Sequence, residues 1–352
     1  MSRYLIDRYQ SLEVYTPGEQ PQDMQYVKLN TNESPYPPSP AVIGAAAREA
    51  GRLQLYSDPV CAALRDAIAG LYGVGRENVY VSNGSDDILN FAFMAFAGQG
   101  GKACFPDISY GFYRVFGDLH GCDYATIPLK ADFSVDPADY YGRDGLIVIA
   151  NPNAPTGMAL PADAVEGILR ANPNSVVLID EAYVDFGAES CVKLTAKYDN
   201  LLVCQTFSKS RSMAGARLGF AIADAGLIAD LDRIKYSTNP YNVNLMTCAA
   251  GAAAIADNAY YMENCRKIEA TRAETARRLR DLGFEVLDSK ANFLFAKSDR
   301  VDGETLYLEL KKRGVLVRHF TTPRIRDYNR ITVGTPAQMD ILIDKIKAIL
   351  GA

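Results

Sequence analysis

The sequence predicts an α/β protein with two domains, and three observations support this prediction. The chain has 352 residues, enough for a large core and for more than one domain. Four short apolar runs in its middle each end in a polar cluster, as the strands of a buried parallel sheet do. Its C-terminal part alternates strand-like and helix-like segments. We therefore expect a large domain with a mostly parallel, mixed sheet flanked by helices, and a smaller α/β domain.

The four apolar runs are the expected strands of the large domain. They cover residues 78–81, 146–150, 176–179 and 201–204. The last three are separated by roughly 25 to 30 residues, the length of a β-α-β unit. Residues 162–171 carry apolar side chains on one helical face and are expected to form a crossover helix. Residues 30–40 contain four prolines and are expected to form a long loop that lines a site.

The part of the chain after residue 244 predicts the small domain. A helical pattern reaches residue 280 with a break near Asn258, and Gly283 marks a helix stop. The expected elements that follow are strands 293–296, 315–317 and 330–333 and helices 303–312 and 337–350. We predict a large domain over residues 30–262 and a small domain formed by residues 1–29 and 263–352.

The composition excludes several classes of protein. Hydrophobic residues make up 48% and charged residues 22%, as in a soluble enzyme. With a net charge of −5 and no basic block, neither nucleic acid nor a membrane surface is an expected partner. Seven scattered cysteines and two histidines argue against a metal site and fit free thiols in a reducing cytosol. No apolar run has membrane-spanning length, and no secretory signal is apparent, so we expect a cytoplasmic protein.

A lysine follows the fourth apolar run, where the predicted strand ends. Lys209 lies beside Ser208 and eight residues before Arg217. A lysine amine can form a Schiff base with an aldehyde cofactor, while a serine and an arginine hold the phosphate of that cofactor. The alternative is a solvated loop with ordinary surface cations. The residues at the other strand ends decide between the two interpretations.

The other strand ends carry side chains that suit the same chemistry, because ligands of open α/β sheets bind beyond the carboxyl ends of the strands. Asp180 closes an apolar run, and a buried carboxylate there suits a pyridinium N–H as partner. Tyr183, three residues later, could donate a hydrogen bond to a phenolate oxygen of the cofactor, and the Tyr110 ring could stack on the cofactor ring. Gly84 and Ser85 precede a helical pattern whose N–H groups suit a phosphate. Helix caps and turns would explain one such strand end more easily than four.

The acidic and basic residues around these positions have different expected roles. Asp86 and Asp87 are expected only as favourable charges at a helix N-terminus. Arg318 and Arg330 sit at strand boundaries, where guanidinium groups suit a carboxylate or phosphate of a substrate. Arg324 is expected in a solvated loop.

These residues, in this order and spacing, resemble the pyridoxal-phosphate-dependent aminotransferases of the aspartate aminotransferase fold. Among them the chain is most similar to the histidinol-phosphate aminotransferases, over about residues 15–336. The matching stretches are residues 29–36, 82–86, 151–157, 180–183, 208–217 and 330–335. Each motif alone is moderately specific, and their common order makes the resemblance strong.

The resemblance implies a role for each candidate residue. Lys209 would carry pyridoxal 5′-phosphate, and Asp180 and Tyr183 would meet the ring nitrogen and the phenolate oxygen. The expected phosphate ligands are Gly84, Ser85, Ser208 and Arg217, with Tyr110 stacked on the ring. A tyrosine matching Tyr56 reaches the phosphate in the neighbouring subunit, so a homodimer with shared active sites is expected. The residues expected to border the substrate are Tyr15, Arg318 and Arg330.

One position departs from the family pattern. The family usually reads Asn-Asn-Pro-Thr-Gly, and the asparagine before that proline contacts the phenolate oxygen. Here that position is Ala154. Either Asn153 takes over the contact or the contact is absent.

The resemblance implies transamination between a small-molecule amino donor and a keto acceptor, here L-histidinol phosphate and 2-oxoglutarate in histidine biosynthesis. Two other enzymes would use the same apparatus, an aromatic-amino-acid transaminase and a threonine-phosphate decarboxylase. A regulator that binds the cofactor without turnover is a different class of alternative. Such a regulator normally carries a DNA-binding module, for which this chain has no room.

Overall fold

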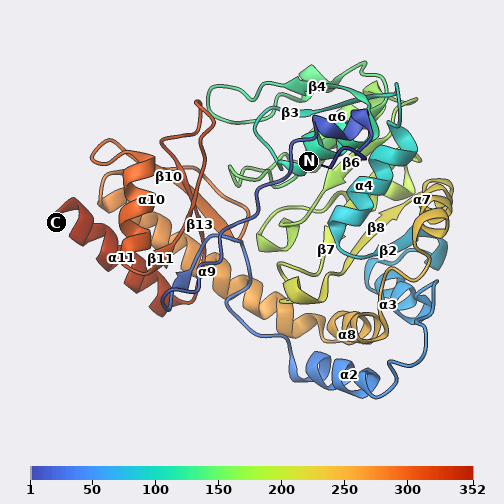
Figure 1. Cartoon of the computed structure of the whole chain (residues 1–352), viewed down its shortest axis with the longest axis horizontal. Coiled ribbons are helices and arrows are strands. Elements are labelled where there is room, and N and C mark those ends of the chain that lie inside the picture. The colour runs from blue at the N-terminus through green and yellow to red at the C-terminus, as the bar shows by residue number, and fades with distance from the viewer. Residues whose placement is uncertain (1, 352) are drawn as a thin grey trace.

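The computed structural model describes residues 2–351 and is built around a seven-stranded mixed sheet (Figure 1). In spatial order the strands are β2 (Val79–Ser82), β8 (Gly219–Ala223), β7 (Leu201–Thr206), β6 (Val177–Asp180), β5 (Leu146–Ala150), β3 (Lys102–Pro106) and β4 (Asp123–Ile127). Only β8 runs against its neighbours β2 and β7. Strands β2, β3, β5, β6 and β7 therefore all point the same way, and their carboxyl ends meet at one edge of the sheet.

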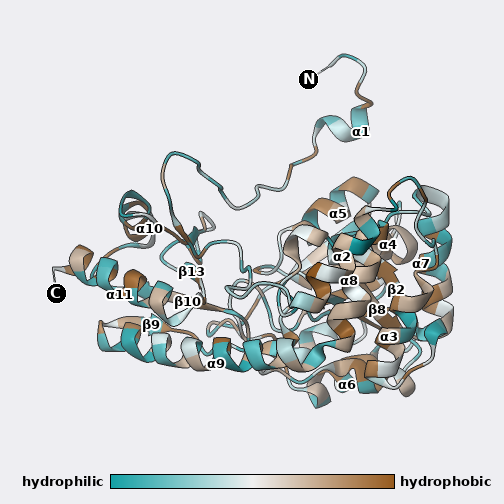
Figure 2. Ribbon diagram, turned by 90° about the horizontal axis from the view of Figure 1, so that it is seen from below, coloured by the Kyte–Doolittle hydropathy of each residue, from teal (hydrophilic) through white to brown (hydrophobic). Residues whose placement is uncertain are grey.

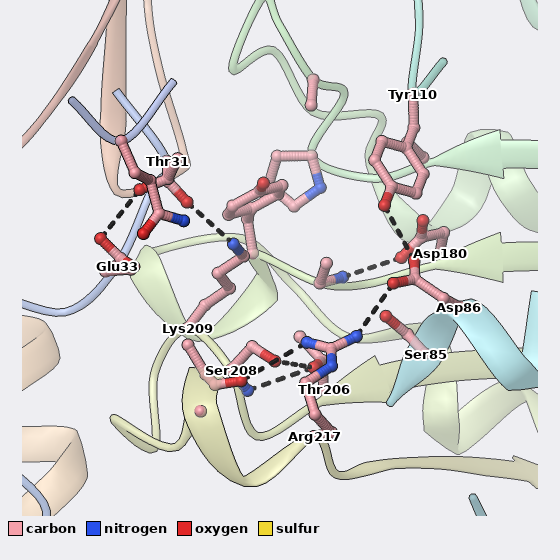
Figure 3. A pocket seen from close by; sticks show the side chains of 18 residues that line it. Thr31, Glu33, Ser85, Asp86, Tyr110, Asp180, Thr206, Ser208, Lys209 and Arg217 are labelled. Atoms are coloured by element: carbon pink, nitrogen blue, oxygen red, sulfur yellow. Dashed lines mark hydrogen bonds and ion pairs between the residues drawn. The ribbon is translucent and has the colours of Figure 1, made fainter. Parts of the chain in front are cut away.

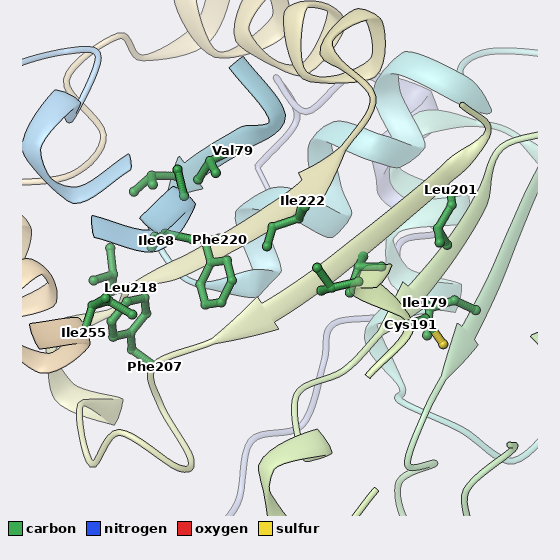
Figure 4. Close-up of a cluster of buried hydrophobic side chains, with 14 of the residues drawn as sticks. Ile68, Val79, Ile179, Cys191, Leu201, Phe207, Leu218, Phe220, Ile222 and Ile255 are labelled. Carbon is green, nitrogen blue, oxygen red and sulfur yellow. The ribbon is translucent and has the colours of Figure 1, made fainter. Parts of the chain in front are cut away.

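The central strands are apolar because helices cover both faces of the sheet. Successive residues of a strand alternate between the two faces, so Ile147 and Ile149 join one buried cluster and Leu146 and Val148 the other. The first cluster (Figure 4) packs against α2 (Pro40–Ala50), α3 (Ala62–Tyr72), α6 (Ala162–Ala171) and α8 (Leu245–Ala256). The second packs against α4 (Ser85–Phe96), α5 (Phe112–His120) and α7 (Ala225–Thr238).

A second, smaller region follows the helix α9 (Asn258–Asp281), which at 24 residues is about 36 Å long and runs from one region into the other (Figures 1 and 2). Its antiparallel sheet has the order β12 (Arg318–His319), β13 (Asn329–Thr332), β10 (Phe293–Ser298) and β9 (Phe284–Val286). Helices α10 (Gly303–Lys312) and α11 (Pro336–Leu350) pack on it around a separate core.

The N-terminal segment joins both regions. It holds the short helix α1 (Asp7–Gln10) and runs outside the packed helices in Figure 2. The Arg8 guanidinium donates to the Leu119 carbonyl, 2.8 Å away, at the end of α5. Further along, β1 (Val27–Lys28) pairs in parallel with β11 (Val315–Leu316) of the small region. Residues 1 and 352, the ends of the predicted small domain, lie outside the described residues.

The expected strands and helices are present with small shifts at their ends, and the helical break near Asn258 is confirmed between α8 and α9. Three strands of the large sheet, β3, β4 and β8, had not been predicted. The crossover from β6 to β7 contains the 3₁₀ helices η3 (Val184–Phe186) and η4 (Cys191–Ala196) in place of an α-helix. Between residues 2 and 351, no helix is both long and apolar enough to cross a membrane.

Candidate active site

Two adjoining cavities lie at the carboxyl edge of the large sheet, with volumes of about 380 and 410 Å³. Such volumes suit a small ligand. The cavities share the residues Thr31, Tyr110, Ala154, Tyr183 and Lys209. The first cavity is bounded mainly by strand ends of the large sheet (Figure 3). The second extends toward the small region, so the two form one continuous candidate site.

Lys209 lies where the two cavities meet. It follows β7, and its Nζ donates to the Thr31 carbonyl, 3.2 Å away, in the loop expected to line the site (Figure 3). Burial, with a smaller contribution from the Arg330 guanidinium, lowers the pKa of Lys209 to about 8. An appreciable fraction of the amine is therefore neutral near pH 7, and a neutral amine is a nucleophile and a base.

Asp180 ends β6 and faces the first cavity, where only 5% of its surface is exposed. Its Oδ2 accepts from the Tyr113 hydroxyl at 2.8 Å, and its Oδ1 accepts from the Ala182 N–H at 3.2 Å. Burial raises the pKa of Asp180 to about 6, although these hydrogen bonds favour the charged form. Within residues 2–351 no cation forms an ion pair with Asp180, so its buried carboxylate suits a cationic N–H donor from a ligand. Sequence reasoning missed Tyr113, which no pattern distinguished from the 20 other tyrosines.

A group of hydrogen-bond donors, which we call the anion cradle because such donors suit an anion, forms the end of the first cavity opposite the N-terminal loop (Figure 3). Helix α4 begins at Ser85 after Gly84, and no side chain caps its first N–H groups. Gly84 has φ +86°, and a Cβ there would lie 2.8 Å from Nη2 of Arg217. A Cβ on Gly219 would lie 2.5 Å from the Ser85 nitrogen. These glycines let the helix start and Arg217 approach each other closely, and the buried Ser208 lines the same cavity, so amide, guanidinium and hydroxyl donors face one small space.

Asp86 connects two of the predicted residues, although the sequence indicated only a helix-end charge. Its Oδ1 accepts from the Tyr110 hydroxyl at 2.8 Å, and its Oδ2 pairs with the Arg217 guanidinium at 3.0 Å (Figure 3). Tyr110 is thereby fixed at the wall of both cavities, and its ring meets that of Tyr113 edge-on at 5.7 Å. Asp86 thus orients the tyrosine and the arginine together.

Tyr183 is oriented by a residue of the N-terminal loop. Its hydroxyl accepts from Nδ2 of Asn32 at 3.0 Å, and Oδ1 of Asn32 accepts from the Thr332 hydroxyl at 2.9 Å. Asn32 is buried with φ +57°, a conformation that asparagine tolerates better than most residues. The loop thus reaches the small region and the large sheet at one point. Asn32 lay in a matching stretch, but its partner could not be read from the sequence.

Asn153 is buried beside the site without lining either of the two cavities. Its Nδ2 donates to the Ile108 carbonyl and the Thr156 hydroxyl at 3.0 and 3.2 Å. Its Oδ1 accepts from the Ser109 hydroxyl at 2.8 Å. The amide is therefore committed to the surrounding loop, and Ala154 stands at the cavity wall instead.

The second cavity brings together Tyr15, Arg318 and Arg330. Arg330 donates to the Asn30 carbonyl at 3.0 Å, while its buried Nε has no partner among residues 2–351. Arg318 is held by the Thr16 and Pro17 carbonyls at 3.1 and 3.2 Å. Because neutral carbonyls hold both guanidinium groups, their charges remain available to an anion. The Tyr15 ring stacks on Phe112 at 4.2 Å and lines the same cavity.

Two other predicted positions lie outside this cluster. Tyr56 is 82% exposed, stacks on Tyr241 at 4.7 Å and does not line either cavity. Arg324 was expected in a solvated loop, but it also contacts the large region: its guanidinium donates to the Lys130 carbonyl and lies over the Phe133 ring, with 5.0 Å between Cζ and the centroid.

Comparison with known proteins shows the family to which this chain belongs. The family described as Aminotransferase class I and II matches residues 24–346. A histidinol-phosphate aminotransferase of Brachyspira hyodysenteriae is 51% identical over 99% of both chains, and one of Marinomonas sp. is 49% identical over 99% of this chain and 100% of the relative. The crystal structure of histidinol-phosphate aminotransferase from Sinorhizobium meliloti, in complex with pyridoxal-5′-phosphate, shares the fold with a TM-score of 0.90. It is 24% identical and covers 100% of this chain and 98% of its own. The chain therefore belongs to the class I and II aminotransferase family and, within it, to the histidinol-phosphate aminotransferases.

Proposed function

We propose that this enzyme exchanges an amino group between L-histidinol phosphate and 2-oxoglutarate, a reaction of histidine biosynthesis, with pyridoxal 5′-phosphate as cofactor. One observation carries the proposal: Lys209, with its lowered pKa, lies at the junction of a cavity that contains Asp180 and an anion cradle and a cavity that contains two arginines. The names of the curated relatives support the choice of substrate.

The residues of the first cavity fit this cofactor. The uncapped helix start at Ser85, with Ser208 and Arg217, offers donors to its phosphate. Asp180 forms no ion pair with any described residue and offers its carboxylate to the ring nitrogen. The other residues that we assign to cofactor binding are Gly84, Tyr110, Tyr183 and Lys209. Asn153 is assigned no contact, because its amide is committed to loop groups.

When bound, the cofactor supplies an electron sink for the carbon that loses or gains the amine. Asp180 would hold the ring nitrogen of the cofactor and stabilise positive charge there, because its charged carboxylate is itself held by the Tyr113 and Ala182 donors. Lys209 removes a proton from the substrate carbon in its neutral form and returns one in its charged form. A pKa of about 8 keeps both forms accessible near neutral pH.

The second cavity is proposed to bind the parts of the substrate that do not react. Arg330 and Arg318 offer fork-shaped donors to the phosphate of the amino donor and to a carboxylate of the keto acceptor. Tyr15 would line the same cavity beside the bound substrate. One arginine pair would thereby accept two anions of different shape in alternate half-reactions.

A substrate panel tests the proposal directly. The purified enzyme, supplied with pyridoxal phosphate and 2-oxoglutarate, is given histidinol phosphate, phenylalanine or threonine phosphate, and the 2-oxoglutarate-dependent product and released CO2 are both measured. We expect the highest kcat/KM with histidinol phosphate and no CO2. Preference for phenylalanine would identify an aromatic-amino-acid transaminase, and CO2 release from threonine phosphate a decarboxylase. An absence of turnover with every donor would favour a cofactor-binding regulator.

We further infer a cytoplasmic homodimer with shared active sites. Tyr56 and its neighbours Leu53 and Leu55 expose 82%, 60% and 51% of their surfaces, which supports an interface on this segment. Seven free cysteines support a reducing compartment. The separate hydrophobic cores support domains at residues 30–262 and at 1–29 with 263–352. Sedimentation equilibrium tests the dimer, because a monomer at micromolar concentration would contradict shared sites.

A further inference from the structure

Two cysteines face each other where two helices of the large region pack together. Cys61 lies at the start of α3 and Cys248 in the first turn of α8, and these two helices pack side by side (Figure 1). Their Sγ atoms are 3.4 Å apart, and the Cys248 thiol donates to the Cys61 sulfur. The two residues are separated by 187 positions in the sequence, so the fold alone brings them together.

The surroundings of Cys61 favour a thiolate. Cys61 is the N-cap residue of α3, an end of the helix where the dipole stabilises negative charge. The hydrogen bond from Cys248, with contributions from the Lys235 and Arg65 cations, lowers the pKa of the Cys61 thiol, although burial and the Asp58 carboxylate act in the opposite direction; the pKa of Cys248 is raised. Lys235 is itself buried and is held by the Pro59 carbonyl at 2.6 Å.

The other five cysteines have no such partner among the described residues. Burial raises the pKa of each of them: Cys104, Cys122, Cys191, Cys204 and Cys265. Reactivity of a thiol follows its thiolate fraction and its access to solvent. Cys61 has the favourable charge environment but is buried, with 4% of its surface exposed, so a peroxide has to reach the pair from the side of Cys248, which is half-buried.

We propose that Cys61 and Cys248 form a redox-active dithiol that hydroperoxides convert into an intramolecular disulfide. The Cys61 thiolate attacks one oxygen of the hydroperoxide, which breaks the O–O bond and leaves Cys61 as a sulfenic acid and the other oxygen as hydroxide or alkoxide. The Cys248 sulfur then attacks the Cys61 sulfur, forms the S–S bond and displaces the hydroxyl group, which leaves as water with the Cys248 proton. The two thiols lose two electrons, and the peroxide gains them.

The disulfide would tie the start of α3 to α8. Cys61 ends a tight segment in which its N–H donates to the Asp58 carbonyl at 3.0 Å, and Cys61 itself has φ +53°. A cross-link between residues so distant in sequence restricts the unfolded chain strongly. Oxidation should therefore raise the midpoint of thermal unfolding by several degrees.

The test treats the purified holoenzyme with a few molar equivalents of hydrogen peroxide and maps its peptides without reduction. We expect loss of two thiols per chain, a cross-linked peptide that contains both cysteines, and recovery of both thiols with dithiothreitol. In Cys248→Ser the sulfenic acid on Cys61 should persist and react with dimedone, while Cys104→Ser, the matched control, should behave as the wild type. If wild-type Cys61 and Cys248 stay reduced while other cysteines oxidise, or if disulfides form only between chains, the proposal is overturned.

Discussion

The two ends of the candidate site are built differently. At the end with Asp180 and Arg217, the side chains come from strand ends and a helix start of one sheet and already bond to one another, as Tyr110, Asp86 and Arg217 do. At the other end, Arg318 and Arg330 come from the small region and are held by carbonyls of the N-terminal segment. The first end is a set of mutually fixed groups, and the second is a set of charges left available.

This difference indicates which end of the site can accept more than one ligand. Groups that hold one another in fixed positions accept a narrow range of ligand shapes, because they do not rearrange around a different ligand. Guanidinium groups held by neutral carbonyls accept any anion that reaches them. Under the proposed function, we therefore expect the cofactor, which takes part in both half-reactions, at the first end and the two alternating substrates at the second. The predictions below follow from this division.

The largest effect is expected at the junction of the two ends. Lys209→Ala removes the base and nucleophile, so kcat should fall by about 10³-fold or more. Borohydride reduction of the wild type with pyridoxal phosphate should label the peptide that contains Lys209, and the variant should remain unlabelled there. Ser208→Ala is the matched control, since it keeps the lysine and should retain the label. A labelled lysine elsewhere in the variant would contradict the assignment.

A large effect is also expected at the strand end of β6. Asp180→Asn removes a buried charge that faces the cavity and should lower kcat by about 100-fold, equivalent to about 3 kcal/mol. Tyr113→Phe keeps the carboxylate and its contact with the Ala182 N–H, so kcat should fall only about tenfold. Because the Tyr113 hydrogen bond favours the charged form, its loss should also raise the pKa of Asp180. Equal losses in the two variants would show that the carboxylate charge is not the important property.

At the substrate end, Arg330→Lys should lower kcat/KM more than Arg318→Lys. Arg330 is more enclosed, and its Nε has no partner in the described part of the chain, so we expect kcat/KM to fall about 50-fold for the Arg330 variant and about tenfold for the Arg318 variant. Both half-reactions should be measured separately by single-turnover kinetics. Substitutions that impair only one half-reaction would show that the two substrates do not share the arginines.

The pH dependence of cofactor uptake distinguishes Lys209 from a lysine with an ordinary pKa. Because the pKa of Lys209 is lowered to about 8, its neutral form increases as pH rises and is nearly complete above that value. The rate constant for reconstitution of the apoenzyme with pyridoxal phosphate should rise about tenfold per pH unit below 8 and level off above it. A rate that continues to rise toward pH 10 would indicate an unshifted lysine.

The smallest effect on activity is expected at Asn153. Asn153→Ala removes the hydrogen bonds to Ser109, Ile108 and Thr156 and should reduce the free energy of unfolding by about 1 to 3 kcal/mol. The affinity for pyridoxal phosphate should change less than twofold, as measured by equilibrium dialysis. Loss of cofactor affinity without loss of stability would mean that the asparagine contacts the cofactor after all.

Much of the fold could be predicted because its central strands are continuous apolar runs that end in polar clusters. The strands β5, β6 and β7 were identified in this way, whereas β4 was missed because its residues are alternately exposed and carry Asp123 and Thr126. Strand β8 was missed because it follows the lysine loop directly, without the helix that separates parallel strands. Periodicity indicates an element only where burial imposes a clear pattern.

The candidate site could be predicted where a residue type is costly at its position, as with Asp180 at the end of a buried run. The partners of such residues could not. Tyr113, Asp86 and Asn32 are linked to the site by hydrogen bonds across 67, 131 and 151 positions of sequence. Their importance depends on the packing of helices and loops, which sequence spacing alone does not define.

The proximity of Arg330 to Lys209 has a consequence for the order of events. The Arg330 guanidinium is one of the groups that disfavour the ammonium form of Lys209. An anion that docks on Arg330 screens this repulsion, so the arrival of each substrate should shift the lysine toward its protonated form. The departing product would reverse the shift, so proton affinity at the lysine would be coupled electrostatically to occupancy of the arginine.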